Sequence, residues 1–151
     1  MKRKIKVYLD TSVISAMFDE KNPERKALTE NFFKKIDDFE AYVSEITVAE
    51  IDRTQDSKLR NQMRETIAGF QILSLTDEVE WVANEYVQYG AVPSGYSEDA
   101  SHIAITVVNE IDYLLSWNFR HIVRRRTKDI VRMVNTLNSL KQIEIMTPAE
   151  F

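Results

Sequence analysis

Residues 5–12, IKVYLDTS, determine how the N-terminal part of this protein folds. Residues 5–9 are rich in β-branched and aromatic side chains and alternate between apolar and polar, which predicts a strand. The hydroxyl of Thr11 or Ser12 is a suitable N-cap for a short helix after it. Asp10 therefore stands where an apolar strand passes into a helix.

Strand-like and helix-like patterns alternate along the rest of the chain. From Glu24, apolar residues at 28, 32, 36 and 39 repeat at helical spacing, which predicts one helix with these side chains on one face. We expect strands at 41–44, 72–75, 112–116 and 143–146, and helices at 44–51, 57–70, 76–86, 97–109 and 128–140. Strands that alternate with helices predict an α/β fold, with a mostly parallel sheet covered by helices on both faces.

The composition is that of an ordinary globular domain. The chain has 151 residues, 44% of them hydrophobic and 29% charged, so residues 1–151 suit a single domain and do not suit a disordered chain. It has no cysteine, which excludes disulfides, thiolate catalysis and cysteine zinc sites. No apolar run approaches the ~20 residues of a membrane helix, and Asp10 interrupts the place where a signal peptide would be apolar. We therefore expect a cytoplasmic protein that does not bind a membrane.

Four oxygen-bearing side chains are candidates for a site. Asp10 and Asn118 follow predicted strands, Glu50 lies on the helix after the second strand, and Asp99 lies in the first turn of the helix predicted at 97–109. In open α/β sheets, sites form at the carboxyl ends of the strands. Three carboxylates in one cleft would repel one another, and Mg²⁺ relieves this because it takes oxygen ligands and keeps several waters. Asp10 also suits a turn, and Asp99 suits the positive end of a helix. The apolar neighbours of Asp10 and Glu50 favour the metal, because an unpaired charge among apolar groups is costly.

Four segments of the chain resemble the signature regions of the PIN-domain nucleases. They are residues 7–13 (VYLDTSV), 47–51 (TVAEI), 98–104 (EDASHIA) and 113–122 (YLLSWNFRHI), in the order and at the spacing usual in that family. The chain is most similar to the single-domain VapC-like toxins of toxin–antitoxin pairs. The resemblance implies a three-layer α/β/α fold and an endoribonuclease that depends on Mg²⁺ or Mn²⁺ and leaves 5′-phosphate and 3′-hydroxyl ends. It also implies a homodimer and an antitoxin protein as partner.

The resemblance makes Asp10, Glu50 and Asp99 the metal-binding and catalytic acids, and Thr11 or Ser12 the hydroxyl that supports the first of them. Asn118 is included with them as a catalytic residue, although the family commonly has an aspartate there. Its amide oxygen can ligate a metal or hold a water but brings no charge, which weakens a second metal site more than the first. The leading prediction is a metal-dependent endoribonuclease toxin. The alternative is a non-catalytic RNA- or protein-binding module on the same fold.

A basic segment follows Asn118. Residues 118–132 contain six basic side chains and one acidic one, a local charge of +5 in a protein whose net charge is −4. Phosphate contacts by arginine and lysine give affinity for any RNA sequence, so we expect substrate contacts here, at the rim of the proposed cleft. The expected contacts are Arg120, Arg124, Arg125, Arg126 and Lys128. The alternative is a solvated helix face, and an acidic antitoxin segment would suit the same residues.

The two histidines and two nearby aromatic residues each have a structural and a functional interpretation. His102 lies one turn after Asp99, where it either tunes that acid or packs in the core, and packing is favoured. His121 is either a phosphate or proton-transfer group or a structural histidine, which is favoured. Trp117 is expected in the core, and Tyr96 either touches substrate or packs locally.

Other catalytic folds lack support in this sequence. Phosphatases of the haloacid dehalogenase type need a second aspartate two residues after the first, where this chain has Ser12. Three scattered glycines cannot form the glycine-rich loop of a dinucleotide site or a P-loop. With two histidines and no nucleophile elbow, a serine triad is excluded as well.

Overall fold

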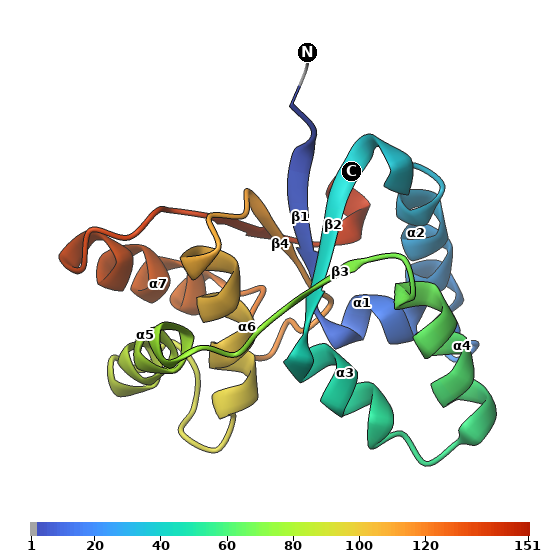
Figure 1. The fold of residues 1–151 in the computed structure, drawn as a ribbon, viewed down its shortest axis with the longest axis horizontal. Coiled ribbons are helices and arrows are strands. Elements are labelled where there is room, and N and C mark those ends of the chain that lie inside the picture. Colours follow the sequence, from blue (N-terminus) through green and yellow to red (C-terminus); the bar gives the residue numbers. More distant parts are fainter. Residues whose placement is uncertain (1–2) are drawn as a thin grey trace.

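The computed structural model describes residues 3–151 and confirms the predicted α/β/α architecture (Figure 1). Its centre is a five-stranded sheet in the order β3-β2-β1-β4-β5, in which neighbouring strands are parallel. The strands are β1 (Ile5–Leu9), β2 (Phe39–Ser44), β3 (Gln71–Leu73), β4 (Tyr113–Leu115) and β5 (Glu144–Met146). Because all five strands are parallel, their carboxyl ends meet at one edge, where β1 lies between β2 and β4.

Helices cover both faces of the sheet. One layer holds α1 (Thr11–Ala16), α2 (Pro23–Phe33), α3 (Glu45–Asp52) and α4 (Ser57–Ile67), drawn to the right in Figure 1. The other holds α5 (Asp77–Gln88), α6 (Ser97–Val108) and α7 (Arg125–Leu137), drawn to the left. Short 3₁₀ turns lie at η1 (Ile36–Asp38) and η2 (Pro148–Glu150).

The alternation of side chains along the strands builds two separate cores. Tyr8, Tyr42, Leu114 and Ile145 pack against the layer of α5, α6 and α7. Their neighbours Val7, Leu9, Val43 and Leu115 pack against the layer of α1 to α4. Successive residues of a strand point to opposite faces, so a buried parallel strand is apolar on both sides.

The helix predicted from Glu24 to Phe39 is wrong in its second half. The observed helix α2 ends at Phe33, Ile36 lies in η1, and Phe39 begins β2. The rings of Phe32 and Phe39 still meet, with centroids 5.5 Å apart. Their helical spacing is a coincidence of sequence, because the sheet and not a helix turn brings Phe39 to Phe32.

Several element boundaries also differ from the predictions. The N-cap of α1 is Asp10, whose Oδ1 accepts a hydrogen bond from the backbone N–H of Val13 at 3.3 Å, and not Thr11 or Ser12. Ser44, the first residue of the predicted helix 44–51, is the N-cap of α3, and Ser97 is the first residue of α6. Helix α4 ends three residues before position 70, and α7 begins three residues before position 128.

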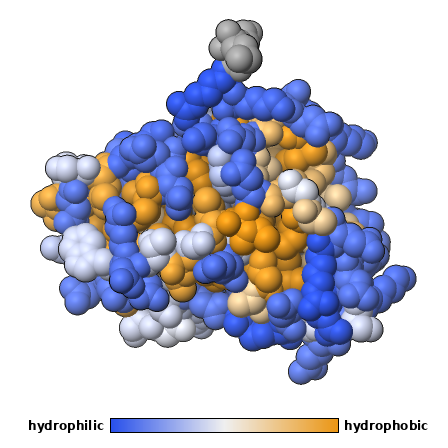
Figure 2. Space-filling model, viewed as in Figure 1, coloured by the Kyte–Doolittle hydropathy of each residue, from blue (hydrophilic) through white to orange (hydrophobic). Residues whose placement is uncertain are grey.

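The surface keeps some large apolar side chains exposed. In the view of Figure 1, hydrophobic residues are visible across the face of the molecule between hydrophilic ones (Figure 2). The exposed ones are Ile5, Ile72, Leu75, Trp81, Tyr89, Tyr96, Phe119, Met133 and Leu137. None of the helices formed by residues 3–151 has the length and apolar character needed to cross a bilayer.

Candidate active site

Asp10 lies at the carboxyl end of β1 and is almost fully buried, with 4% of its surface exposed. Its Oδ1 accepts a hydrogen bond from Ser12 Oγ at 2.5 Å, and its Oδ2 accepts one from Ser116 Oγ at 2.6 Å. Ser116 directly follows β4, and the pairing of Leu9 with Leu115 brings it beside Asp10. Of the two hydroxyls expected to support this acid, Ser12 is therefore the one bonded to it.

The environment of Asp10 disfavours its charge. Burial raises the pKa of Asp10 above 3.8 and outweighs the charge of His102 and the two serine hydroxyls, which act in the opposite direction. The charge of Glu50 raises the pKa further. A cation nearby would reverse both effects.

Glu50 lies on α3 and is half-buried. Its Oε1 accepts two hydrogen bonds, from Thr11 Oγ1 at 2.8 Å and from His102 Nε2 at 2.6 Å. Burial raises the pKa of Glu50, but the hydrogen bond and charge of His102 together with the Thr11 hydroxyl outweigh it, so the net pKa is lowered. Glu50 is therefore ionised at neutral pH. Thr11 supports Glu50 and not Asp10.

His102 is buried as expected, but its partners are specific. Its Nδ1 lies 2.6 Å from the hydroxyl of Tyr8, which lies 2.7 Å from Ser44 Oγ. Its Nε2 contacts Glu50 and not Asp99, the neighbour on its own helix. The interpretation as a packed histidine is thus correct for its burial, and the hydrogen bond to Glu50 was not anticipated.

Asp99 stands in the first turn of α6 and is paired with the second histidine. Its Oδ2 lies 3.0 Å from His121 Nδ1, and the ring of Tyr96 lies against His121 with centroids 4.0 Å apart. Burial raises the pKa of Asp99, against the lowering effects of His121 and His102. Tyr96 accordingly packs locally while remaining half exposed.

Asn118 contacts the backbone of His121 and not Asp99. Its Oδ1 accepts the backbone N–H of His121 at 3.0 Å, and its own backbone N–H donates to Ser116 Oγ at 2.9 Å. The side-chain oxygen is therefore engaged in the turn that presents His121 to Asp99. Trp117, next to it, is buried as predicted, and its indole N–H donates to Thr29 Oγ1 at 2.8 Å.

The three carboxylates are neighbours without forming a finished metal site. The charge of Glu50 raises the pKa of both Asp10 and Asp99, so Glu50 lies within electrostatic reach of each of them. Among residues 3–151, no three acidic or histidine side chains are grouped closely enough to enclose a metal ion. Their carboxylate oxygens are nevertheless hard donors of the kind that Mg²⁺ and Mn²⁺ prefer. The chemistry of the donors fits such an ion.

An open pocket of about 270 Å³ adjoins two of these acids. Its lining includes Glu50, Asp99, Tyr96 and Arg53, and the guanidinium of Arg53 forms an exposed ion pair with Glu98 at 2.8 Å. Arg53 was not among the substrate contacts predicted from the sequence, because Arg53 lies outside the basic segment. Its position three residues after Glu50, on the end of the same helix, is the signal that identifies it.

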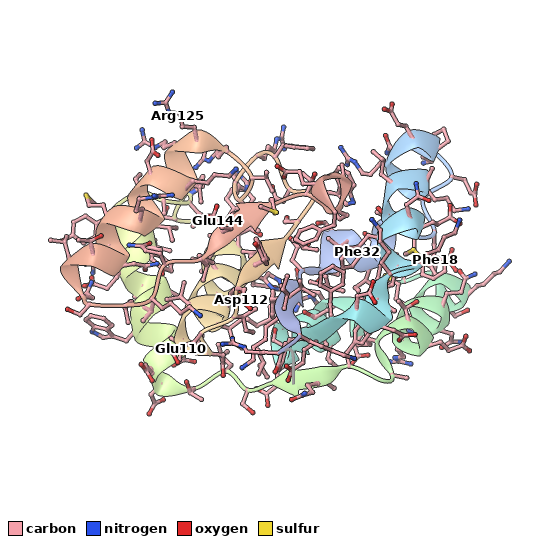
Figure 3. The ribbon with its side chains drawn as sticks, turned by 90° about the horizontal axis from the view of Figure 1, so that it is seen from above. Phe18, Phe32, Glu110, Asp112, Arg125 and Glu144 are labelled. Atoms are coloured by element: carbon pink, nitrogen blue, oxygen red, sulfur yellow. The ribbon has the colours of Figure 1, made fainter. Side chains whose placement is uncertain are left out.

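The basic side chains of residues 118–132 differ in their surroundings. Arg124 donates to Thr127 Oγ1 at 2.7 Å and to the carbonyl oxygen of Ala91 at 3.1 Å, so it holds the start of α7. Lys128 lines a different pocket, beside β5. Arg125 projects outward from α7 with 94% of its side chain exposed (Figure 3). Arg120 and Arg126 are exposed as well.

The paired charges predict the titration of His102 in the metal-free protein. Burial lowers its pKa, but the Tyr8 oxygen and the carboxylates of Glu50 and Asp10 raise it well above 6.5. With the folded pKa raised, the stabilising contribution is complete below pH 6.5 and is lost as the pH rises through the raised value. We expect Glu50→Gln to bring the pKa down, as followed by NMR of the imidazole C–H protons. A control, Glu45→Gln at the start of the same helix, leaves it unchanged, and a wild-type pKa at or below 6.5 contradicts the expectation.

Comparison with known proteins was made on the sequence and on the fold. The family model of the PIN domain matches residues 7–118. VapBC2 from Rickettsia felis, solved bound to a DNA fragment from its promoter, has a TM-score of 0.60 and 10% identity over 93% of this chain and 97% of that chain. VapC20 from Mycobacterium tuberculosis, described as a Sarcin-Ricin loop cleaving toxin, has a TM-score of 0.59 and 14% identity over 76% and 92%. At such identities the likeness is one of fold, and no curated protein sequence matches the chain.

Proposed function

Because this chain belongs to the PIN domain family, we propose that it is a metal-dependent endoribonuclease that acts as the toxin of a toxin–antitoxin pair. One observation carries the proposal: Asp10 stands at the carboxyl end of β1, Glu50 acts electrostatically on both Asp10 and Asp99, and each of the three acids is held by its own polar partners. Within residues 3–151, Glu50 Oε2 and Asp99 Oδ1 accept no hydrogen bond, so each keeps one oxygen for a ligand.

Asp10, Glu50 and Asp99 would hold Mg²⁺ or Mn²⁺. When bound, such an ion lowers the pKa of a bound water and neutralises charge on a phosphoryl oxygen. Glu50 stays ionised, so its free Oε2 can accept a hydrogen bond from the water that attacks the phosphorus. The phosphodiester bond to the 3′ oxygen breaks, which leaves a 3′-hydroxyl and a 5′-phosphate.

The surroundings of the acids supply contacts for the RNA backbone. Arg53 is exposed and shares the pocket with Glu50 and Asp99, and its charge suits a phosphate close to the cleaved bond. Arg120, Arg125 and Arg126 remain as further candidates because their side chains are exposed. Arg124 drops out of the proposed set, since its guanidinium already binds Ala91 and Thr127.

The partners in the proposal follow from the family and the fold. VapC20 is described as a Sarcin-Ricin loop cleaving toxin, and VapBC2 is a VapBC assembly. By extension, we propose for this chain an antitoxin partner and an RNA loop as substrate. The proposal includes a homodimer in the cytoplasm. We propose that exposed apolar side chains take part in the contacts with the antitoxin and with the second copy of the chain.

The decisive experiment is cleavage of an end-labelled structured RNA by the purified protein. We expect cleavage with Mg²⁺ or Mn²⁺ and none with EDTA, because neutralising three carboxylates requires the ion. RNA that is bound in a salt-sensitive way but stays intact under every metal would contradict the nuclease and support the alternative, a binding module.

That alternative has one observation in its favour, the neutral Asn118. An amide carries no charge, and the side-chain oxygen of Asn118 already accepts the N–H of His121. If the wild-type protein binds without cutting, Asn118→Asp separates an incomplete active site from a true binding module. Cleavage gained by this variant indicates the former, and its absence indicates the latter.

A further inference from the structure

Glu50 is held through only one of its two carboxylate oxygens. Oε1 accepts a hydrogen bond from Thr11 Oγ1 at 2.8 Å and another from His102 Nε2 at 2.6 Å. No donor from residues 3–151 reaches Oε2. Two donors on one oxygen define the plane of the carboxylate and leave the other oxygen for a ligand.

His102 is in turn held from behind. Its Nδ1 lies 2.6 Å from the hydroxyl of Tyr8, and Tyr8 contacts Ser44 Oγ at 2.7 Å. Ser44 also caps α3, the helix that carries Glu50. The buried chain of hydrogen bonds therefore runs from the cap of α3, through β1 and α6, back to the acid on α3.

The direction of the hydrogen bond between His102 and Glu50 does not depend on the charge of the imidazole. An ionised carboxylate only accepts, so Nε2 carries a proton and donates to Glu50 in both forms. A hydroxyl donates or accepts, so Tyr8 serves Nδ1 in either form. The hydrogen bond from His102 Nε2 to Glu50 Oε1 therefore forms with either the neutral or the protonated imidazole.

Packing alone does not account for this arrangement. A histidine in a core needs a partner for each nitrogen, and a backbone carbonyl together with a backbone N–H suffices for that. Here both partners are side chains from other elements, and the second is a half-buried acid at the proposed site. His102 itself is fully enclosed, with 3% of its side chain exposed.

We propose that His102, backed by Tyr8, is the positioning residue that holds Glu50 by Oε1 and so presents Oε2 to the metal ion or the attacking water. The proposal rests on the proposed nuclease function for its kinetic effect. The placement of Glu50 itself is a property of the free protein.

The test compares three site variants with a matched control. His102→Leu fills the space without a donor, His102→Gln restores an amide N–H near the place of Nε2, and Tyr8→Phe removes only the hydroxyl. The control is Tyr86→Phe, which also removes the hydroxyl of a fully buried tyrosine, but one bonded to Asn135 at 2.5 Å and not linked to the acids.

We expect His102→Leu to lower kcat for RNA cleavage by about 10–100-fold, with KM changed by less than about twofold, because binding of RNA does not depend on the placement of Glu50. The affinity for Mn²⁺, measured by calorimetry, falls with kcat. His102→Gln recovers most of the loss, and Tyr8→Phe shows a smaller loss than His102→Leu. Tyr86→Phe keeps the wild-type kcat even where its thermal stability falls as much as that of Tyr8→Phe.

A crystal structure of metal-free His102→Leu provides the readout that does not need activity. Displacement of Glu50 from Thr11 supports the proposal, and an unmoved Glu50 overturns it whether or not the wild type cleaves RNA. A wild-type kcat in folded His102→Leu also overturns it. If His102→Leu does not fold, structures of Tyr8→Phe and His102→Gln decide: Glu50 displaced in the first and held in the second is the expected pair, and any other pair overturns the proposal. Absence of cleavage by the wild type is a failure of the nuclease proposal alone.

Discussion

Asp10→Asn is expected to lower the rate of RNA cleavage by about three orders of magnitude, since metal-assisted charge stabilisation contributes several kcal/mol and each ~1.4 kcal/mol is tenfold in rate. Asp10 is the most deeply buried of the three acids and comes from the central strand. An amide at this position leaves a single neutral oxygen as ligand. The measurement is the single-turnover rate on an end-labelled RNA at saturating Mg²⁺.

The same variant is not expected to be less stable. Because the folded pKa of Asp10 is raised, the contribution of this group to folding becomes unfavourable as the pH rises above 3.8 through the folded value. At pH 7 the asparagine removes that cost, and the hydroxyls of Ser12 and Ser116 can rotate to suit the amide. The melting temperature at pH 7 should therefore be equal to or above that of the wild type.

The matched control is Asp56→Asn. Asp56 is also an N-cap aspartate, which accepts the backbone N–H groups of Lys58 and Leu59 at the start of α4, but it is exposed. Its replacement should leave the cleavage rate unchanged. Full activity in Asp10→Asn would refute the assignment of the metal to these carboxylates, and loss of activity in both variants would show that the effect is not specific to the site.

Phe32→Ala is expected to destabilise the protein by about 3–5 kcal/mol, the usual cost of removing a fully buried aromatic ring. Phe32 has no exposed surface, and its ring contacts those of Phe33, Phe39 and Phe151, with centroids 5.6, 5.5 and 6.0 Å away. It therefore ties α2 to the start of β2 and to the C-terminal end of the chain. Urea unfolding at 25 °C measures the change.

The melting temperature should fall by about 10 °C, since 1 kcal/mol corresponds to ~2–4 °C in a domain of this size. Leu137→Ala serves as the control, because 63% of Leu137 is exposed and the substitution should cost less than ~0.5 kcal/mol. Well below the melting temperature, Phe32→Ala should retain wild-type cleavage, because Phe32 belongs to the core and contacts none of the three acids. A loss of stability no larger than that of Leu137→Ala would mean that the cluster of rings does not hold α2.

Local pattern was sufficient to predict the architecture and the place of Asp10 at the end of β1. Residues 5–9 form β1 as the alternation predicted, and the five strands with their intervening helices form the expected parallel sheet. A strand in such a sheet must be apolar on both faces, and a carboxylate directly after it must emerge at the carboxyl edge. That is why Asp10 could be assigned to this edge without coordinates. Pattern failed at 24–39, where helical spacing continued past the end of the helix.

By itself, then, the sequence of this protein determined which elements form, their order along the chain and which acids face the edge of the sheet, because these depend on neighbours a few residues away. Only the tertiary structure decided the partners: Ser116 for Asp10, His102 for Glu50 and His121 for Asp99. It also decided the surroundings of two predicted RNA contacts: Arg124 donates to the carbonyl oxygen of Ala91, and Lys128 lies beside β5. Periodicity specifies the face on which a side chain lies, whereas a hydrogen bond between residues 52 positions apart depends on strand order and on how two helices turn against each other.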